Sequence, residues 1–206
     1  LTIGAALERY EPDALRYALA SNFPETSDVD ITEDELVRRI NDELVATWGN
    51  LVNRVISMTH RYFDGTVPEP GTADAADATL LETIDETLAS AADQLRAVHL
   101  RGGLATLLSG AQAANQYLSE QQPWKTAKTD LARTGATLHT ALQAIAGLAV
   151  GFAPFLPMTS GRTLTMLGFD ADERQPLWER RLVAAGTRLG AATPLFAKVE
   201  PPHSES

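Results

Sequence analysis

The stretch NDELVATWGNLVNRVISMTHRYF (residues 41–63) decides the fold, because its apolar side chains recur with the period of an α-helix. These side chains form one stripe, made of Leu44, Trp48, Leu51, Val52, Val55, Met58, Thr59 and Tyr62. A helix with such a stripe buries it against neighbouring elements. The stretch therefore predicts a long helix packed inside a helical domain.

The same stretch carries a second, polar stripe. Asn50, Arg54, Ser57 and Arg61 follow one another by four, three and four positions. At about 100° per residue they lie roughly 100° or more from the apolar stripe. An amide, a hydroxyl and two guanidiniums in a row can read base edges or hold phosphates. The alternative is an ordinary solvated helix face.

The rest of the chain predicts an all-α, antiparallel helix bundle with short loops, because helical periods recur and strand signals are almost absent. Thr32, with Glu35 three residues later, is typical of a helix start. The further helices are expected at residues 12–20, 32–39, 77–100, 104–120, 123–149 and 159–167. Gly102-Gly103 is expected to separate two helices. Residues 176–185 are expected to be partly helical, and residues 189–202 irregular, ending in a tail with little core-forming content.

A second group of candidate binding residues falls at one predicted junction between helices. The group comprises Asn115, Tyr117, Pro123, Trp124, Lys125 and Lys128. Pro123 suits the first turn of a helix, and Trp124 follows it directly. An exposed indole beside cations can stack on an unpaired base, which is worth about 1–3 kcal/mol per base. The alternative is that Trp124 packs into the core. Trp48, on the apolar stripe, and Trp178, which anchors the last irregular segment, are both expected to be structural.

Composition excludes several classes of site. The chain of 206 residues has no cysteine and four scattered histidines, so we expect neither disulfides nor a metal site. A net charge of −10 argues against non-specific nucleic-acid binding, although a small basic patch remains compatible with it. The longest apolar run, near residues 144–157, is broken by glycines and prolines. We therefore expect no membrane span or signal peptide, and a cytoplasmic location.

Several motifs, in this order, carry a family resemblance. They are Tyr10-Glu11-Pro12-Asp13-Ala14-Leu15-Arg16-Tyr17, Trp48-Gly49-Asn50-Leu51-Val52-Asn53-Arg54-Val55, Asn115-Gln116-Tyr117, Gln122-Pro123-Trp124-Lys125-Thr126-Ala127-Lys128, Ala153-Pro154-Phe155-Leu156-Pro157-Met158-Thr159, Leu167-Gly168, Leu189-Gly190 and Thr193-Pro194-Leu195-Phe196. The ordered set covers nearly the whole chain. It resembles the anticodon-binding helical domain of methionyl-tRNA synthetase, a class I aminoacyl-tRNA synthetase.

The resemblance implies a bundle that recognises the CAU anticodon of methionine tRNA. The enzyme's catalytic domain, using ATP with Mg²⁺, then attaches methionine. The family's tryptophan after a proline matches Trp124 in this chain, with Pro123 and Lys125 beside it. The family's Asn and Arg on the long helix align either with Asn50 and Arg54 or with Ser57 and Arg61, and in the second alignment Ser57 replaces the expected Asn. By the same resemblance, residues 1–25 are a connector after the catalytic domain, 26–200 the bundle and 201–206 a tail.

The resemblance also sets expectations about what this chain lacks. The family's His-Ile-Gly-His-like and Lys-Met-Ser-Lys-Ser-like motifs do not occur in the sequence, which opens at Leu1. We therefore expect a part of a longer polypeptide, with no catalytic residues, metal or cofactor of its own. Two alternatives remain: a helical protein-interaction bundle without an RNA role, and an independent enzyme. Candidate acids for that enzyme are Glu33, Asp34, Glu35 and Asp42.

Overall fold

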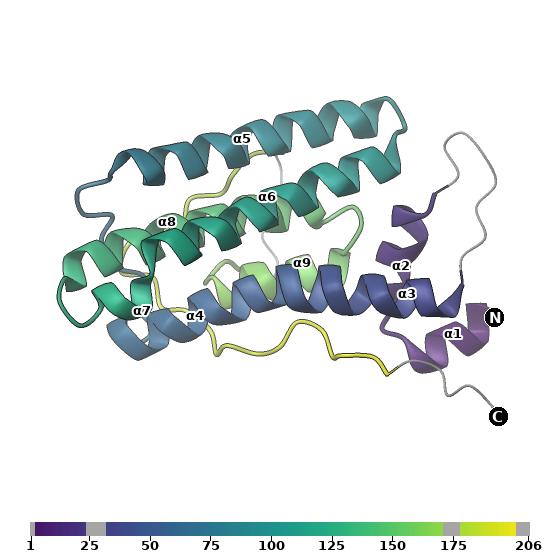
Figure 1. Cartoon of the computed structure of the whole chain (residues 1–206), viewed down its shortest axis with the longest axis horizontal. Coiled ribbons are helices and arrows are strands. Elements are labelled where there is room, and N and C mark those ends of the chain that lie inside the picture. The colour runs from purple at the N-terminus through teal and green to yellow at the C-terminus, as the bar shows by residue number, and fades with distance from the viewer. Residues whose placement is uncertain (1–2, 24–31, 171–177, 201–206) are drawn as a thin grey trace.

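A continuous helical rod runs along one side of the molecule and carries the stretch that predicted the fold (Figure 1). The computed structural model describes residues 3–23, 32–170 and 178–200. The rod consists of α3 (Glu33–Arg39), the π-helical segment η1 (Ile40–Gly49) and α4 (Asn50–Phe63). It begins at Thr32, whose side chain accepts a hydrogen bond from the Glu35 N–H at 3.2 Å. The expected helix start at Thr32 is confirmed.

The rod corrects the expectation of one uniform α-helix over residues 41–63, because its first part is π-helical. Two side-chain bonds accompany the wider turns: Thr47 Oγ1 donates to the Asp42 carbonyl, and Asn115 Nδ2 donates to the Thr47 carbonyl. Asn115 is 68 residues away in sequence, so periodicity within the stretch does not reveal its contact. The apolar stripe is nevertheless buried at Leu44, Trp48, Leu51, Val52, Val55 and Thr59, and half-buried at Met58 and Tyr62.

Three long helices complete the bundle: α5 (Ala75–Arg96), α6 (Leu100–Gln121) and α8 (Leu131–Phe152). α6 and α8 pack against the rod, and α5 packs against α6 and α8 (Figure 1). The structure places Gly102-Gly103 inside the first turn of α6, not between two helices as expected. The turn lies at residues 97–99, where Val98 has a φ of 61°. α8 is long and apolar enough to cross a membrane by length and composition, but 94% of its most apolar window is buried in the bundle. This pattern is that of a core helix.

The helix expected from Pro123 to about residue 149 is interrupted. The structure has a four-residue helix, α7 (Pro123–Thr126), then a turn, and then α8. Asp130 starts α8 by accepting a hydrogen bond from the Arg133 N–H at 2.9 Å. An aspartate that caps a new helix in this way explains the break, since its side chain replaces the missing intrahelical partner.

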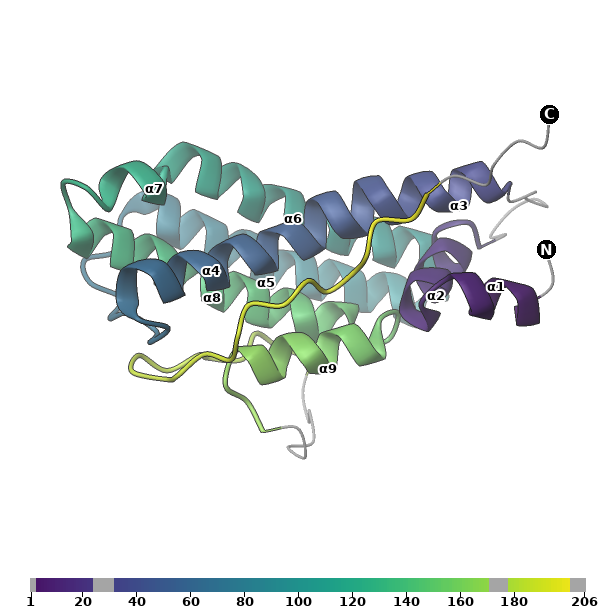
Figure 2. The ribbon, with the colours of Figure 1, turned by 90° about the horizontal axis from the view of Figure 1, so that it is seen from below.

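Residues 178–200 form a segment, here called the strap. Its first part lies against α5 and α8, and its last part, residues 190–199, runs along the rod toward the N-terminal helices (Figure 2). Its described residues contain no helix, which corrects the expectation for 178–185; residues 176–177 lie outside the described part. Residues 189–200 are irregular, as expected, but Leu195 and Phe196 are buried. The expected tail, residues 201–206, lies outside the described part of the chain. Side-chain amides hold the strap: Gln143 pairs with both backbone groups of Val183, and Asn41 with both of Val199.

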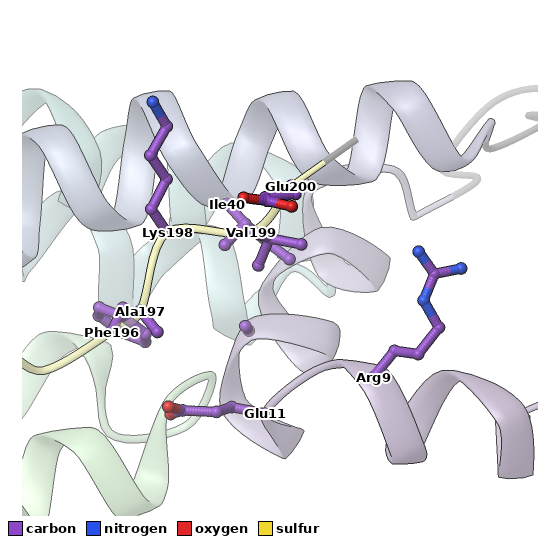
Figure 3. Close-up of a pocket in the computed structure, with 9 residues that line it drawn as sticks. Arg9, Glu11, Ile40, Phe196, Ala197, Lys198, Val199 and Glu200 are labelled. Atoms are coloured by element: carbon purple, nitrogen blue, oxygen red, sulfur yellow. The ribbon is translucent and has the colours of Figure 1, made fainter. Parts of the chain in front are cut away.

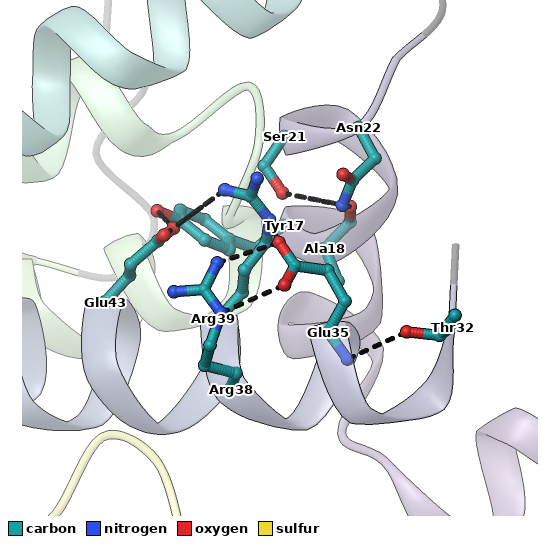
Figure 4. A network of polar contacts seen from close by, with 9 residues as sticks. All are labelled: Tyr17, Ala18, Ser21, Asn22, Thr32, Glu35, Arg38, Arg39 and Glu43. Carbon is teal, nitrogen blue, oxygen red and sulfur yellow. Dashed lines mark hydrogen bonds and ion pairs between the residues drawn. The ribbon is translucent and has the colours of Figure 1, made fainter. Parts of the chain in front are cut away.

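The N-terminal part of the described chain packs at one end of the rod. It comprises α1 (Ile3–Arg9) and α2 (Pro12–Ser21), and α9 (Pro157–Met166) lies beside α2. Polar contacts fasten α2 to the rod, including a hydrogen bond of 2.6 Å from the Tyr17 hydroxyl to Glu43 (Figure 4). The predicted domain boundary near residue 25 falls within residues 24–31, outside the described part of the chain.

Candidate nucleic-acid interface

The polar stripe of the rod lies on the outer face of α4. Asn50, Ser57 and Arg61 are exposed, and Arg54 is half-buried, whereas the opposite face of α4 is buried in the core. The guanidinium of Arg61 lies 5.5 Å from the centre of the Tyr62 ring. The expected separation of the two faces is therefore present in the fold.

Trp124 stands at a sharp corner between α6 and α8. Gln122 ends α6 in a left-handed conformation, with a φ of 47°, and the buried Pro123 begins α7 in a new direction. The Trp124 side chain is half-buried and Lys125 is exposed. Part of the indole is therefore exposed to solvent, and the next residue in the sequence is the cationic Lys125.

The two groups that the sequence separated belong to one surface. The guanidinium carbon of Arg54 lies 5.4 Å from the centre of the Trp124 ring, within the range of a cation–π interaction. A tertiary contact therefore joins the polar stripe of α4 to the α7 corner. We call Asn50, Arg54, Ser57, Arg61, Pro123, Trp124 and Lys125 the α4–α7 surface.

Of the other members of the predicted junction, Asn115 and Tyr117 make structural contacts, and Lys128 is exposed. Asn115 holds the Thr47 carbonyl of η1, as described above. Tyr117 is buried, and its hydroxyl donates to Asp77. Lys128 is exposed in the turn between α7 and α8. Sequence adjacency alone grouped these residues with Trp124.

Beneath the corner lies a charge cluster that the sequence analysis did not identify. Arg133 forms a bidentate ion pair with Asp77, at 2.7 and 2.6 Å, and Asp77 is almost fully buried. Burial would raise the pKa of Asp77, but hydrogen bonds from Arg133, Tyr117 and the Asp74 N–H outweigh it and hold the pKa below its ordinary value. Burial, and then the bond to Asp77, raises the pKa of Tyr117.

The candidate acids of the enzyme alternative lie at the far end of the rod. Glu33 receives hydrogen bonds from Arg9 and Tyr10, and Glu35 pairs with Arg38 and Arg39. Burial and the bond to Glu33 raise the pKa of Tyr10 to about 12. Glu33 therefore ties α3 to α1, whereas the ion pairs of Glu35 lie within α3.

A pocket of about 330 Å³ lies at that same end, away from the α4–α7 surface (Figure 3). Its lining comes from the α1–α2 corner, from Ile40 and from strap residues 196–200. None of the predicted site residues lines it. Among the described residues, no group of three or more histidine, aspartate or glutamate side chains is placed to hold a metal ion.

Comparison with known proteins identifies two family descriptions along the chain. Residues 67–206 match "Anticodon binding domain of methionyl tRNA ligase", and residues 1–56 match "tRNA synthetases class I (M)". Trp124 lies in the first of these regions, and Asn50 and Arg54 lie in the second. Ser57 and Arg61 fall between the two regions.

Similar proteins of known name are methionine–tRNA ligases. The chain is 40% identical to that of Roseiflexus sp. (strain RS-1) over 94% of its own length and 37% of the relative's. It is 48% identical to that of Roseiflexus castenholzii over 79% of its length and 27% of the relative's. The chain thus spans about a third of these relatives.

Solved structures of a methionyl-tRNA synthetase share the fold of this chain. The apo form of Mycobacterium tuberculosis methionyl-tRNA synthetase superposes with a TM-score of 0.92 and 30% identity, over 98% of this chain and 42% of that one. The same enzyme bound by methionyl-adenylate gives a TM-score of 0.89 and 31% identity, over 94% and 39% of the two chains. This chain therefore belongs to the methionyl-tRNA ligase family and carries its anticodon-binding domain.

Proposed function

We propose that the α4–α7 surface binds the anticodon loop of methionine tRNA and recognises its CAU anticodon. In the full-length ligase, this recognition presents the tRNA to a catalytic domain of the same polypeptide, which uses ATP with Mg²⁺. The enzyme in one of the similar solved structures is bound by methionyl-adenylate, which supports that chemistry for the full enzyme. We place the protein in the cytoplasm, where tRNA is charged.

The contact between Arg54 and Trp124 is the observation that carries this proposal. A base stacked on the indole would lie beside a guanidinium, which donates in the plane of base edges and also to phosphates. Asn50, one helical turn before Arg54, offers an amide to a base edge. This geometry favours the pair Asn50 and Arg54 over Ser57 and Arg61 for base reading, and leaves Arg61 and Lys125 for phosphates.

Wide separation of Arg54, Arg61 and Lys125 would favour the protein-interaction alternative. Arg54 instead lies against Trp124, so a guanidinium adjoins the indole despite the net charge of −10. A local basic patch on an acidic protein binds a defined RNA shape while repelling RNA elsewhere. The arrangement therefore supports RNA binding over an interaction bundle.

The test is a titration of the chain with an RNA stem-loop carrying CAU and with the same stem-loop carrying a changed anticodon, at one salt concentration. We expect Trp124→Ala to weaken binding to the CAU loop by about 5- to 150-fold, the range of one lost stack. Arg54→Ala should reduce the preference for CAU.

Arg96→Ala is the matched control, because it removes the same charge from an exposed pair with Asp93 at the far end of α5. It should leave CAU binding nearly unchanged. Equal binding of both loops by the parent chain, or unchanged binding by Trp124→Ala, would refute the proposal.

A further inference from the structure

Arg133, in the first turn of α8, holds the corner between α6 and α7 where Trp124 lies. Arg133 Nη2 donates to Gln121 Oε1 at 3.1 Å, while the same guanidinium grips the Asp77 carboxylate. Gln121 is the last residue of α6 and lies two positions before Pro123. Arg133 therefore fixes the point where the chain leaves α6 and turns into α7.

A second tether holds the other side of the corner. The hydroxyls of Thr126 and Thr134 lie 2.7 Å apart, and Thr134 is fully buried. Thr126 is the last residue of α7. Two successive residues of α8, Arg133 and Thr134, thus hold the end of α6 before Trp124 and the end of α7 after it.

Compared with well-packed apolar residues of similar volume, the ion pair gives the core no advantage in stability. Taking the Asp77 carboxylate out of water costs free energy that the attraction to Arg133 only repays, so well-packed apolar residues would serve the core as well. A guanidinium, however, is a planar fork that fixes several acceptors at once. This pair fixes α5, through Asp77, and the end of α6, through Gln121, in one geometry.

We infer that Arg133, anchored by Asp77, is a positioning residue that sets the orientation of Trp124 for stacking. The inference rests on the proposed binding of RNA by the α4–α7 surface. It adds that affinity for the anticodon loop depends on a charge pair that does not itself contact RNA. Preorganising an aromatic platform in this way lowers the ordering cost of binding.

Direct contact between Arg133 and a phosphate is the competing explanation, and Asp77→Asn separates the two. If Arg133 bound phosphate, removing its counter-charge would strengthen RNA binding. Positioning predicts weaker binding instead, because the anchor of the guanidinium is lost. The salt dependence separates them too: losing a phosphate contact lowers the slope of log affinity against log salt by about 1, whereas losing a positioning residue leaves the slope unchanged.

The decisive experiment is a double-mutant cycle with Arg133→Lys and Trp124→Ala, titrated with the CAU stem-loop. Lysine keeps the charge but lacks the fork, and we expect it to weaken binding about fivefold in the parent chain. In the Trp124→Ala background the same change should have almost no effect, since the residue acts through the indole. Thr126→Val removes the second tether without disturbing a buried charge. It should weaken binding when Trp124 is present and have almost no effect in the Trp124→Ala background.

Arg180→Lys is the matched control, because Arg180 makes a bidentate pair with Asp85 and its side chain is 18% exposed, against 19% for Arg133. It joins the strap to α5, and it should not change binding. Fluorine NMR of the fluorotryptophan-labelled chain, which has three tryptophans, gives an independent readout. In Arg133→Lys the Trp124 resonance should shift or broaden while those of Trp48 and Trp178 stay in place.

The outcomes are distinguishable. Unchanged binding by Trp124→Ala would refute the proposed function and this inference with it. If Trp124→Ala weakens binding but Arg133→Lys and Thr126→Val do not, the proposed function stands and the inference is wrong. An effect of Arg133→Lys that is equally large in both backgrounds, or that appears with equal movement of all three resonances, would also overturn the inference.

Discussion

Asp13 is a buried carboxylate in α2 that holds the start of another helix. Its Oδ2 accepts hydrogen bonds from the Thr159 N–H at 2.6 Å and the Thr159 hydroxyl at 2.7 Å. Thr159 lies in the first turn of α9, where backbone N–H groups have no partner within their own helix. A side chain 146 residues away in sequence thus acts as the cap of α9.

We expect Asp13→Ala to destabilise the chain by about 1–3 kcal/mol, the cost of leaving buried donors unsatisfied. Chemical denaturation followed by circular dichroism measures this loss. Asp93→Ala, which breaks only an exposed pair, is the control and should change stability by less than about 0.5 kcal/mol. Equal effects of the two substitutions would contradict the assigned capping role.

Sequence reasoning identified single residues well where a local rule applied, and missed them where the partner was distant. Thr32 as a helix start follows from its own neighbourhood. Asp13, Asp77 and Asn115 act on backbone or side chains of remote segments, and nothing in their local sequence marks those partners. The contact between Arg54 and Trp124 is likewise tertiary; each residue was a candidate, but their meeting was not predictable from spacing.

At the scale of elements, η1 and the strap meet at Gly49. A Cβ built on Gly49 would lie 3.2 Å from the Leu44 carbonyl oxygen and 3.4 Å from the Phe196 ring. The glycine thus allows Phe196 of the strap to pack closely on the π-helical segment. At this crossing η1, a helical segment that the sequence periodicity predicted, packs against the strap, which the periodicity did not predict.

Gly49→Ala should therefore destabilise the chain, because the steric cost at the crossing exceeds the gain in helix propensity. Gly161→Ala is the control: it lies inside α9 with open space around its Cβ, and should stabilise by about 0.5–1 kcal/mol. Thermal unfolding of both variants measures the contrast. A stabilised Gly49→Ala would show that the crossing is looser than these distances indicate.

The element boundaries that sequence reasoning missed have physical causes. The break between α7 and α8 depends on Asp130 as a cap, in a run that is otherwise compatible with a helix. The strap shows no helical or strand periodicity in its sequence; amide clamps from Gln143 and Asn41 and a few backbone hydrogen bonds at residues 186–190 hold it to remote segments. The long amphipathic helices were predictable because each buries one apolar stripe, and that stripe repeats over many residues of the sequence.

For the molecule as a whole, acid should weaken the fold through Asp77. Its pKa is lowered from an ordinary value near 3.8, so the folded state binds the proton less readily than the unfolded chain. This contribution is present above the ordinary pKa and is lost as pH falls through the lowered one. We expect the stability of the parent chain to decline in that acidic range.

Asp77→Asn should be less stable than the parent near neutral pH, and its stability should decline less steeply in acid. Urea unfolding midpoints measured from about pH 6 to about pH 2.5 test this, since other carboxylates titrate equally in both chains. Parallel pH profiles of the two proteins would mean that another carboxylate carries the acid sensitivity.

The amide clamp between Asn41 and Val199 has a consequence for biosynthesis. Its partners are 158 residues apart, whereas α5 and α6 are neighbours in sequence and pack against each other extensively. Contacts between sequence neighbours form quickly, and contacts that close long loops form late. On the ribosome, the helices would therefore assemble while synthesis continues. η1 would receive its last two hydrogen bonds only after Val199 had left the exit tunnel.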